Sequence, residues 1–450
     1  MDDGSDQPPD RRTDPGTDRE TDPGTGLPAA GPAPATAPLS VLSRRALLGS
    51  AGAGLVAGAA AGVAGGAVLS RSAPHPGAAP PRSGGPASPG AGRVPFHGPR
   101  QAGILDPQQA RVHLAAFDLA AGVSRDGLRE LLKRWSRTAA RLAAGEPAEA
   151  AENQIALDAG PCSLTVTFGF GATLFDRAGL TDRRPPGLEP LPDFPEDALD
   201  RARSDGDLLV QICADDALVA FHALRVLQRQ VVGTAAARWQ MSGFSRTPGA
   251  TERPMTGRNL MGQIDGTNNP KPGEPSFESR VFCGSGQPDW LAGGSYLVFR
   301  RIRMLLDNWE NLPVDRQERV IGRRKSDGAP LSGGSETTAV DLGAQGPDGA
   351  LTIPADAHIR VAAPQSNGGA AMLRRGFSYH DGLLADGSQD AGLLFLAFQA
   401  DPRHGFVPVQ RKLSRGDSLS RFLRHEASGL YAVPPGAPEG GYVGQTLLEG

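Results

Sequence analysis

The sequence contains few cysteines and no excess of either charge, and these absences exclude several classes of protein. Its 450 residues include three cysteines, Cys162, Cys213 and Cys283, which lie too far apart for a disulfide framework or a cysteine-rich metal site. No Cys-x-x-Cys-His motif is present, so covalent attachment of a c-type haem is excluded. Lys and Arg number 46 and Asp and Glu number 49, and this near balance argues against a nucleic-acid-binding protein.

Residues 1–42 have almost no large apolar side chains and are rich in Asp, Pro, Gly and Thr. Such a segment buries too little apolar surface to offset the entropy of ordering, so it is predicted to be disordered. Residues 71–94 are rich in Pro, Gly and Ala and are predicted to be a linker.

Between these two segments, residues 43–70 contain Arg44 and Arg45 followed by a run of Ala, Gly, Val, Leu and Ser. A twin arginine before a mildly apolar run resembles a twin-arginine export signal. A single membrane anchor is the alternative interpretation. If it is an export signal, we expect the twin-arginine machinery as a partner and a final location in the periplasm, the cell envelope or outside the cell. That route suits a protein that acquires its cofactor in the cytoplasm.

The remaining sequence is predicted to form two similar α+β halves, residues 95–256 and 257–445. Apolar alternation and helical spacing predict strands at 112–120, 164–170, 207–214, 234–241, 296–306 and 392–401, and helices at 124–143, 215–231, 314–322 and 407–413. The apolar segments 207–215 and 392–401 both end in Ala-Asp before a predicted helix, which suggests a duplicated unit. The second half contains a longer loop-rich excursion with His358, which we expect to form the wall of a site.

Three short segments contain residues that are able to carry chemistry. Asp265 lies in the Gly- and Asn-rich loop 262–270, where an ordinary Asx-turn is the alternative interpretation. His358 lies in a His-Ile-Arg segment, and a lone histidine is often structural. Arg374 and Arg375 lie beside apolar residues, where a solvated turn would account for them equally well. No HExxH motif and no 2-His-1-carboxylate spacing is present.

In combination and in this order, these segments resemble the dye-decolourising (DyP-type) haem peroxidases. The resemblance rests on the Gly-x-x-Asp-Gly-Thr loop, the His-x-Arg segment, the Arg-x-Gly segment and the apolar strand before Ala-Asp, and it covers residues 95–443. The run 317–331 resembles the exported, deferrochelatase-related subgroup. The fold implied is two ferredoxin-like halves with antiparallel sheets and peripheral helices, arranged like a dimeric α+β barrel, with one non-covalent haem b in the C-terminal half.

The resemblance implies a role for each candidate residue. His358 would be the proximal ligand of the haem iron, a metal site, and leave the opposite face open to peroxide. Asp265 would move a proton between the oxygens of hydrogen peroxide. Arg374 would stabilise the leaving oxygen and bind a haem propionate, with the adjacent Arg375 as the alternative. Further cofactor-binding residues implied by the resemblance are Gly266, Thr267 and Asn268 along the haem edge, Arg323 at a propionate, Ala363, Pro364 and Gln365 on the proximal side, and Phe395 on the distal side.

The chain departs from the family where Ala363-Pro364 replaces a frequent Asn-Pro, which bears on the detail of the proximal pocket. Large donors would not fit a buried haem pocket, which suggests electron transfer through surface aromatic residues. The candidates are Trp239, Trp290, Trp309, Tyr379 and Tyr431.

Three functions remain open from the sequence. The leading hypothesis is a peroxidase that reduces hydrogen peroxide and oxidises a phenolic or dye-like organic donor. The second is a deferrochelatase that releases iron from haem and leaves the porphyrin intact. The third is a ferredoxin-like partner-binding module without haem. The oligomeric state is also left open, with self-association through exposed sheet faces as one option.

Overall fold

The computed structural model describes residues 89–251 and 255–450. The predicted disordered extension, the export signal and the linker up to residue 88 lie outside these residues. Within the described ranges, no helix combines the length and the apolar character needed to cross a lipid bilayer.

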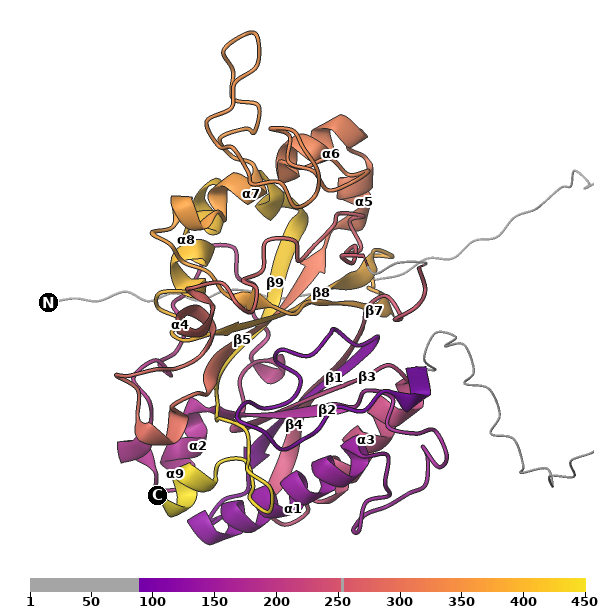
Figure 1. Cartoon of the computed structure of the whole chain (residues 1–450), viewed down its shortest axis with the longest axis vertical. Helices are drawn as coiled ribbons and strands as arrows, with labels where there is room; N and C mark the ends of the chain where they lie inside the picture. Colours follow the sequence, from indigo (N-terminus) through magenta and orange to yellow (C-terminus); the bar gives the residue numbers. More distant parts are fainter. Residues whose placement is uncertain (1–88, 252–254) are drawn as a thin grey trace, which may run out of the picture. The chain divides into compact units, whose positions relative to one another are not determined.

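The N-terminal half is a four-stranded antiparallel sheet covered by two helices. Strands β1 (Arg111–Leu119), β2 (Thr165–Gly171), β3 (Leu208–Ala214) and β4 (Ala235–Phe244) lie in the order β2-β3-β1-β4. Helices α1 (Arg125–Ala143) and α3 (Ala217–Arg229) pack on its outer face, and the short α2 (Ala172–Arg177) follows β2. Both α1 and α3 lie at the bottom of Figure 1.

The C-terminal half repeats this strand order with a much longer crossover. Strands β5 (Ser295–Met304), β7 (Phe377–Leu383), β8 (Gln389–Gln399) and β9 (Leu423–Val433) lie in the order β9-β5-β8-β7, and the two-residue β6 (Leu373–Arg374) also pairs with β8. The helices of this half are α4 (Phe277–Val281), α5 (Leu306–Glu310), α6 (Val314–Ile321), α7 (His358–Val361) and α8 (Phe406–Gly416), while the last helix, α9 (Gln445–Glu449), packs against α1 of the N-terminal half. The segment between α6 and α7 projects at the top of Figure 1.

The outer strands of the two halves pair with each other and close the sheet into a ring. Phe170 and Gly171 of β2 pair with β9, and Phe244 of β4 pairs with Ser378 of β7. Since β5 also pairs with β8, every main strand has two neighbours. The predicted α+β fold, with two antiparallel ferredoxin-like halves in a barrel-like arrangement, is confirmed.

Alternation along the strands separates two apolar regions, because successive side chains of a strand point to opposite faces. Val112, Leu114 and Ala116 of β1 point into the ring, where they join side chains from both halves. Ala115 and Phe117 point outward to the apolar region beneath α1 and α3. The ring interior is therefore a packed core rather than a channel.

Several local predictions are confirmed at the level of single residues. Helix α1 begins after Ser124, whose hydroxyl accepts a hydrogen bond from Gly127 N at 3.1 Å. Its predicted apolar stripe is fully buried, and Trp135 stacks on Phe168 with ring centroids 5.4 Å apart. Strands β7 and β9 and helices α4 and α5 were not predicted from the pattern.

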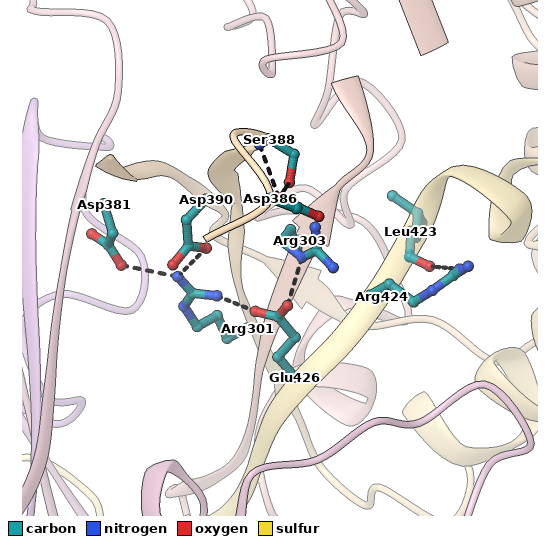
Figure 2. Close-up of polar contacts among 9 residues, drawn as sticks. All are labelled: Arg301, Arg303, Asp381, Asp386, Ser388, Asp390, Leu423, Arg424 and Glu426. Atoms are coloured by element: carbon teal, nitrogen blue, oxygen red, sulfur yellow. Dashed lines mark hydrogen bonds and ion pairs between the residues drawn. The ribbon is translucent and has the colours of Figure 1, made fainter. Parts of the chain in front are cut away.

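One end of the C-terminal half is held together by a buried arginine (Figure 2). Arg301 of β5 is fully buried, and its Nη2 atom lies 2.9 Å from Asp381 Oδ2 and 2.7 Å from Asp390 Oδ1. Its Nη1 atom pairs with Glu426, which also accepts a hydrogen bond from Arg303 Nε at 2.7 Å. Because an unpaired buried guanidinium is costly, these contacts favour the register that joins β5, β7, β8 and β9.

Candidate functional site

His358 is the first residue of the single-turn helix α7. Arg360, two residues later, holds the loop that precedes α7 against this helix. Arg360 donates from Nη2 to Ile353 O and to Leu342 O, each at 2.7 Å, and from Nε to Pro354 O at 3.1 Å. These bonds to backbone carbonyls give Arg360 a structural part and fix the direction in which α7 starts.

His358 is oriented by a buried carboxylate. Its Nδ1 atom lies 2.7 Å from Oδ2 of Asp417, and the other oxygen of Asp417 accepts a hydrogen bond from Leu419 N at 2.9 Å. Burial lowers the pKa of His358, but the charge and the hydrogen bond of Asp417 outweigh it, so that the pKa is raised overall. Within the described residues, no group bonds to Nε2, and a histidine held in this way is typical of a metal ligand.

Asp265 and Arg374 form an ion pair between the Gly- and Asn-rich loop and strand β6. Arg374 Nη1 lies 2.9 Å from Asp265 Oδ1, and about three-tenths of each side chain is exposed. The backbone of Asp265 is held by a hydrogen bond to Gly257 O at 3.0 Å, and Gly266 takes a φ of 115°, which favours glycine. The structure therefore brings these two predicted residues together.

Asn269 is a further residue of this site that the sequence interpretation missed. Its Nδ2 atom donates to Arg374 O at 2.7 Å, and its Oδ1 atom accepts from Arg374 N at 3.2 Å. Within the described part of the chain, strand β6 pairs with β8 alone, so the Asn269 side chain takes the place of a second strand along Arg374. Asp265 and Asn269 thus hold the side chain and the backbone of Arg374 from one loop, and the Asn-Asn-Pro end of that loop was the available signal.

The second arginine of the doublet has a different position. Arg375 is buried, and its guanidinium contacts the N-terminal half through Asp106 O at 2.5 Å, Pro107 O at 3.1 Å and the side chain of Gln109. Arg374 and not Arg375 is therefore the neighbour of Asp265.

Arg323 is buried near Arg374 and is only partly satisfied. Its Nη1 atom donates to Gly328 O at 2.7 Å and to Glu336 O at 2.9 Å, while the other two guanidinium nitrogens have no partner in residues 89–251 and 255–450. Burial lowers the pKa of Arg323, against the effect of Glu336, and Arg374 lowers it further. Thr267 also contacts this region, because its hydroxyl donates to Glu336 at 2.9 Å.

The remaining predicted residues lie on segments that adjoin these groups. Ala363, Pro364 and Gln365 directly follow α7, and Ala363 is buried whereas Gln365 is exposed. Asn268 is exposed and has no hydrogen bond within the described ranges. Phe395 is half-buried on the outward face of β8, two positions from Leu393.

A small cavity of about 80 Å³ adjoins the ion pair and is lined by both halves. Asp265, Arg374 and Leu393 line it from the C-terminal half, and Gln108 and Ser245 line it from the N-terminal half. Because a water takes roughly 30 Å³, the cavity has room for two or three water-sized molecules.

The residues present fit a haem. His358 offers an Nε2 atom without a hydrogen-bond partner in the described residues, and three-tenths of its side chain is accessible. The charges of Arg374 and Asp265 both act on its pKa, which places them near the same space. Arg323 offers unpaired guanidinium nitrogens, which suit a carboxylate of a porphyrin.

The expectation of surface aromatic residues for electron transfer is wrong for the candidates named from the sequence. Each of the five is at most 6% exposed, because each packs within an apolar region of the fold. They are Trp239, Trp290, Trp309, Tyr379 and Tyr431.

Comparison with known proteins gives a consistent result for both halves. Residues 101–245 match the family model described as Dyp-type peroxidase, N-terminal, and residues 256–438 match the model described as Dyp-type peroxidase, C-terminal. The finer boundaries drawn from the sequence, 95–256 and 257–445, stay predictions.

Individual relatives cover most of the chain. A dye-decolorizing peroxidase from Thermobifida fusca (strain YX) is 43% identical over 420 residues, 91% of this chain and 97% of that protein. A deferrochelatase from Escherichia coli (strain K12) is 36% identical over 373 residues, 79% of this chain and 87% of that protein. The structure of ferric DtpA from Streptomyces lividans is 63% identical, with a TM-score of 0.79, and covers 80% of this chain and 98% of that one.

Proposed function

The chain belongs to the DyP-type peroxidase family and is a haem-dependent peroxidase, and from this premise we propose specific roles for three residues. Asp265 is the acid–base group, Arg374 stabilises charge as the O–O bond breaks, and His358 is the proximal ligand of a haem b. The observation that carries the proposal is that the charged pair Asp265–Arg374 lies close enough to act electrostatically on His358, whose Nδ1 is held by Asp417 and whose Nε2 has no partner within the described residues.

The reaction reduces hydrogen peroxide to two waters at the expense of a phenolic or dye-like donor. The chemistry that haem supplies when bound is an iron centre for peroxide and storage for two oxidising equivalents. Asp265 takes the proton from the near oxygen of peroxide and delivers it to the far oxygen, which then leaves as water. Its partly exposed carboxylate and the adjacent cavity give peroxide room to approach.

Arg374 contributes a fixed positive charge. Its guanidinium is held beside Asp265, so it stabilises negative charge on the departing oxygen without rearrangement. The two backbone bonds from Asn269 fix where this charge lies.

His358, positioned by Asp417, would bind the haem iron. The Nδ1–H···carboxylate bond fixes the tautomer that leaves Nε2 free for iron and makes the imidazole a stronger donor. Asp417 is held in turn by the backbone at Leu419, so the ring orientation is set before haem binds.

The proposal is tested by replacing Asp265 with asparagine, which keeps the shape and removes the base. We expect Asp265→Asn to lower the rate constant of the haem-loaded protein with peroxide by about 100-fold or more, with haem content unchanged. The control is Asp348→Asn, an exposed acid of the same half. A wild-type rate in Asp265→Asn would show that the acid–base assignment is wrong.

Deferrochelation is a second candidate because several relatives carry that name. Haem would then be the substrate, and Asp265 and Arg374 would be pocket residues. Metal-free porphyrin and released iron after incubation of the haem-loaded protein would favour this function. Intact haem together with peroxide-dependent oxidation of a phenol would favour the peroxidase.

We also propose that the chain is exported by the twin-arginine route, on the basis of Arg44, Arg45 and the apolar run that follows. Replacement of both arginines with lysine should leave the full chain in the cytoplasm. Unchanged export of that variant would contradict the proposal.

A further inference from the structure

A second cavity lies away from Asp265 and Arg374, between the two halves. Its volume is about 290 Å³, and it is bounded by the loop 187–192 of the N-terminal half, the start of α8 and one residue of β9. The lining residues are Gly187, Glu189, Pro190, Leu191, Pro192, Pro402, Arg403, Val407, Arg411 and Leu430.

The size and the walls of this cavity suit one aromatic ring. Leu191, Val407, Leu430 and the rings of three prolines supply apolar surface, and the prolines keep the loop stiff. A cavity of about 150 Å³ lined by apolar side chains is enough to bind benzene. At about twice that volume, this cavity has room for a single ring with a short substituent.

The charges around the cavity favour one negative charge on the ligand. Arg403 is already paired with Asp401, with Nη2 and Oδ2 2.7 Å apart, and Glu189 lies 3.7 Å from Arg184. Arg411 is exposed on α8 and forms no ion pair or hydrogen bond within residues 89–251 and 255–450. It is therefore the one lining charge left for an anion.

The cavity also lies against an aromatic contact that leads toward the candidate site. Val407 in its wall follows Phe406, whose ring centroid lies 6.0 Å from that of Phe395. Phe395 is on the same face of β8 as Leu393, which lines the cavity beside Asp265 and Arg374. The Phe406–Phe395 contact therefore joins the start of α8, which carries Val407, to this face of β8.

We propose that this second cavity binds the organic electron donor, and that the donor is a single-ring phenol carrying one carboxylate. The carboxylate pairs with Arg411 and the ring packs against Leu191 and Val407. The proposal rests on the peroxidase function proposed above. In the overall reaction two phenols each lose one electron and one proton to become phenoxyl radicals, and one hydrogen peroxide takes up both electrons and both protons to give two waters.

The experiment measures binding first and turnover second, with ferulate as the probe and its neutral methyl ester as the comparison. Isothermal titration of the haem-loaded full chain without peroxide should show ferulate binding that Arg411→Glu weakens by about tenfold or more. Arg415→Glu makes the same charge change on the exposed face of α8 outside the cavity, so it should leave binding unchanged. Leu191→Trp, which fills the cavity from a surface loop, should weaken ferulate and its ester alike.

Measurements of turnover distinguish a failure of the donor-site proposal from a failure of the peroxidase function on which it rests. Arg411→Glu should raise the KM for ferulate about tenfold, leave the KM for the ester unchanged, and leave the reaction with peroxide alone at the wild-type rate. Equal effects of Arg411→Glu and Arg415→Glu would overturn the site, because they would reflect general electrostatics. Failure of the wild type to react with peroxide would instead contradict the proposed function, while the titration still decides whether ferulate binds at Arg411.

Discussion

A histidine–carboxylate pair of the N-terminal half and one of the C-terminal half have almost the same length but use different ring nitrogens. In the N-terminal half, Nε2 of His222 lies 2.8 Å from Glu152 Oε1, and the histidine side chain is 8% exposed. In the C-terminal half, Nδ1 of His358 lies 2.7 Å from Asp417 Oδ2, and 30% of the histidine side chain is accessible. In the first pair, Nε2 of His222 contacts the loop that contains Glu152. In the second pair, Nε2 of His358 has no hydrogen-bond partner within the described residues.

The equivalent strands β3 and β8 also differ in how deeply their outward side chains are buried. The outward residues Leu208, Val210 and Ile212 of β3 are at most 1% exposed, because α1 and α3 cover them. On β8, the equivalent strand of the C-terminal half, Leu393 and Phe395 are only half-buried. The same strand order therefore carries a fully buried outer layer in one half and a partly accessible one in the other, and the long crossover of the C-terminal half contains Arg323, His358 and Arg374.

The largest expected effect comes from removing the free imidazole. His358→Ala should abolish stoichiometric haem retention, because it removes the imidazole that we propose as the iron ligand. The ratio of Soret absorbance to protein after purification with haem available measures this. The matched variant His222→Ala should keep the wild-type ratio and lose only folding stability. Full haem occupancy in His358→Ala would show that His358 is not the iron ligand.

A smaller effect is expected from Asn269, the side chain that holds β6 in place of a strand. Asn269→Ala removes both backbone bonds to Arg374, so the rate constant with peroxide should fall about tenfold while haem content stays constant. Stopped-flow measurement of the haem-loaded variant gives this value. Lys271→Ala, at an exposed position just beyond this loop, should behave like the wild type; equal losses in the two variants would point to a general disturbance of the loop.

The two halves also differ in a strand histidine, which is half-buried in β1 and buried in β9. Burial lowers the pKa of His113 on β1, whereas burial together with Arg300 lowers the pKa of His425 on β9 to about 3. Between about pH 6.5 and about pH 3, His425 binds a proton in the unfolded chain but not in the folded chain. The free energy of unfolding therefore decreases as the pH falls through this window, and His425 has no such effect above it.

His425→Asn should remove that dependence, since asparagine does not titrate. Urea unfolding of the haem-loaded protein at pH 6.5 and 4.5 should show the wild type losing roughly 1 kcal/mol per pH unit more than the variant. An identical acid slope in both proteins would mean that His425 is protonated in the folded state.

The smallest effect is expected from the N-terminal half alone. Ser124→Ala removes the cap of α1 and should lower the free energy of unfolding by about 1 kcal/mol. Haem content and the rate with peroxide should not change, because α1 covers the filled layer. Thermal unfolding together with the Soret ratio measures both, and a loss of haem in this variant would show that the halves are more tightly coupled than their cores suggest.

Most of the N-terminal half could be predicted from sequence because its signals are local. The alternation of β1, the apolar stripe of α1 and the Ser124 cap all lie within a few residues of the elements they define. Strand β7 escaped prediction because its exposed residues interrupt the alternation, and its pairing with β8 includes a register shift.

The sequence by itself indicated a duplicated unit through local periodicity, and its short motifs pointed, through a family resemblance, to the α+β fold class and to the candidate residues Asp265, His358 and Arg374. The tertiary structure alone decided that Arg374 rather than Arg375 meets Asp265, that Asp417 holds His358 and that Asn269 holds β6. Those contacts join residues 59 to 109 positions apart. Partners at such separations are chosen by the packing of whole strands and helices, which no local pattern records.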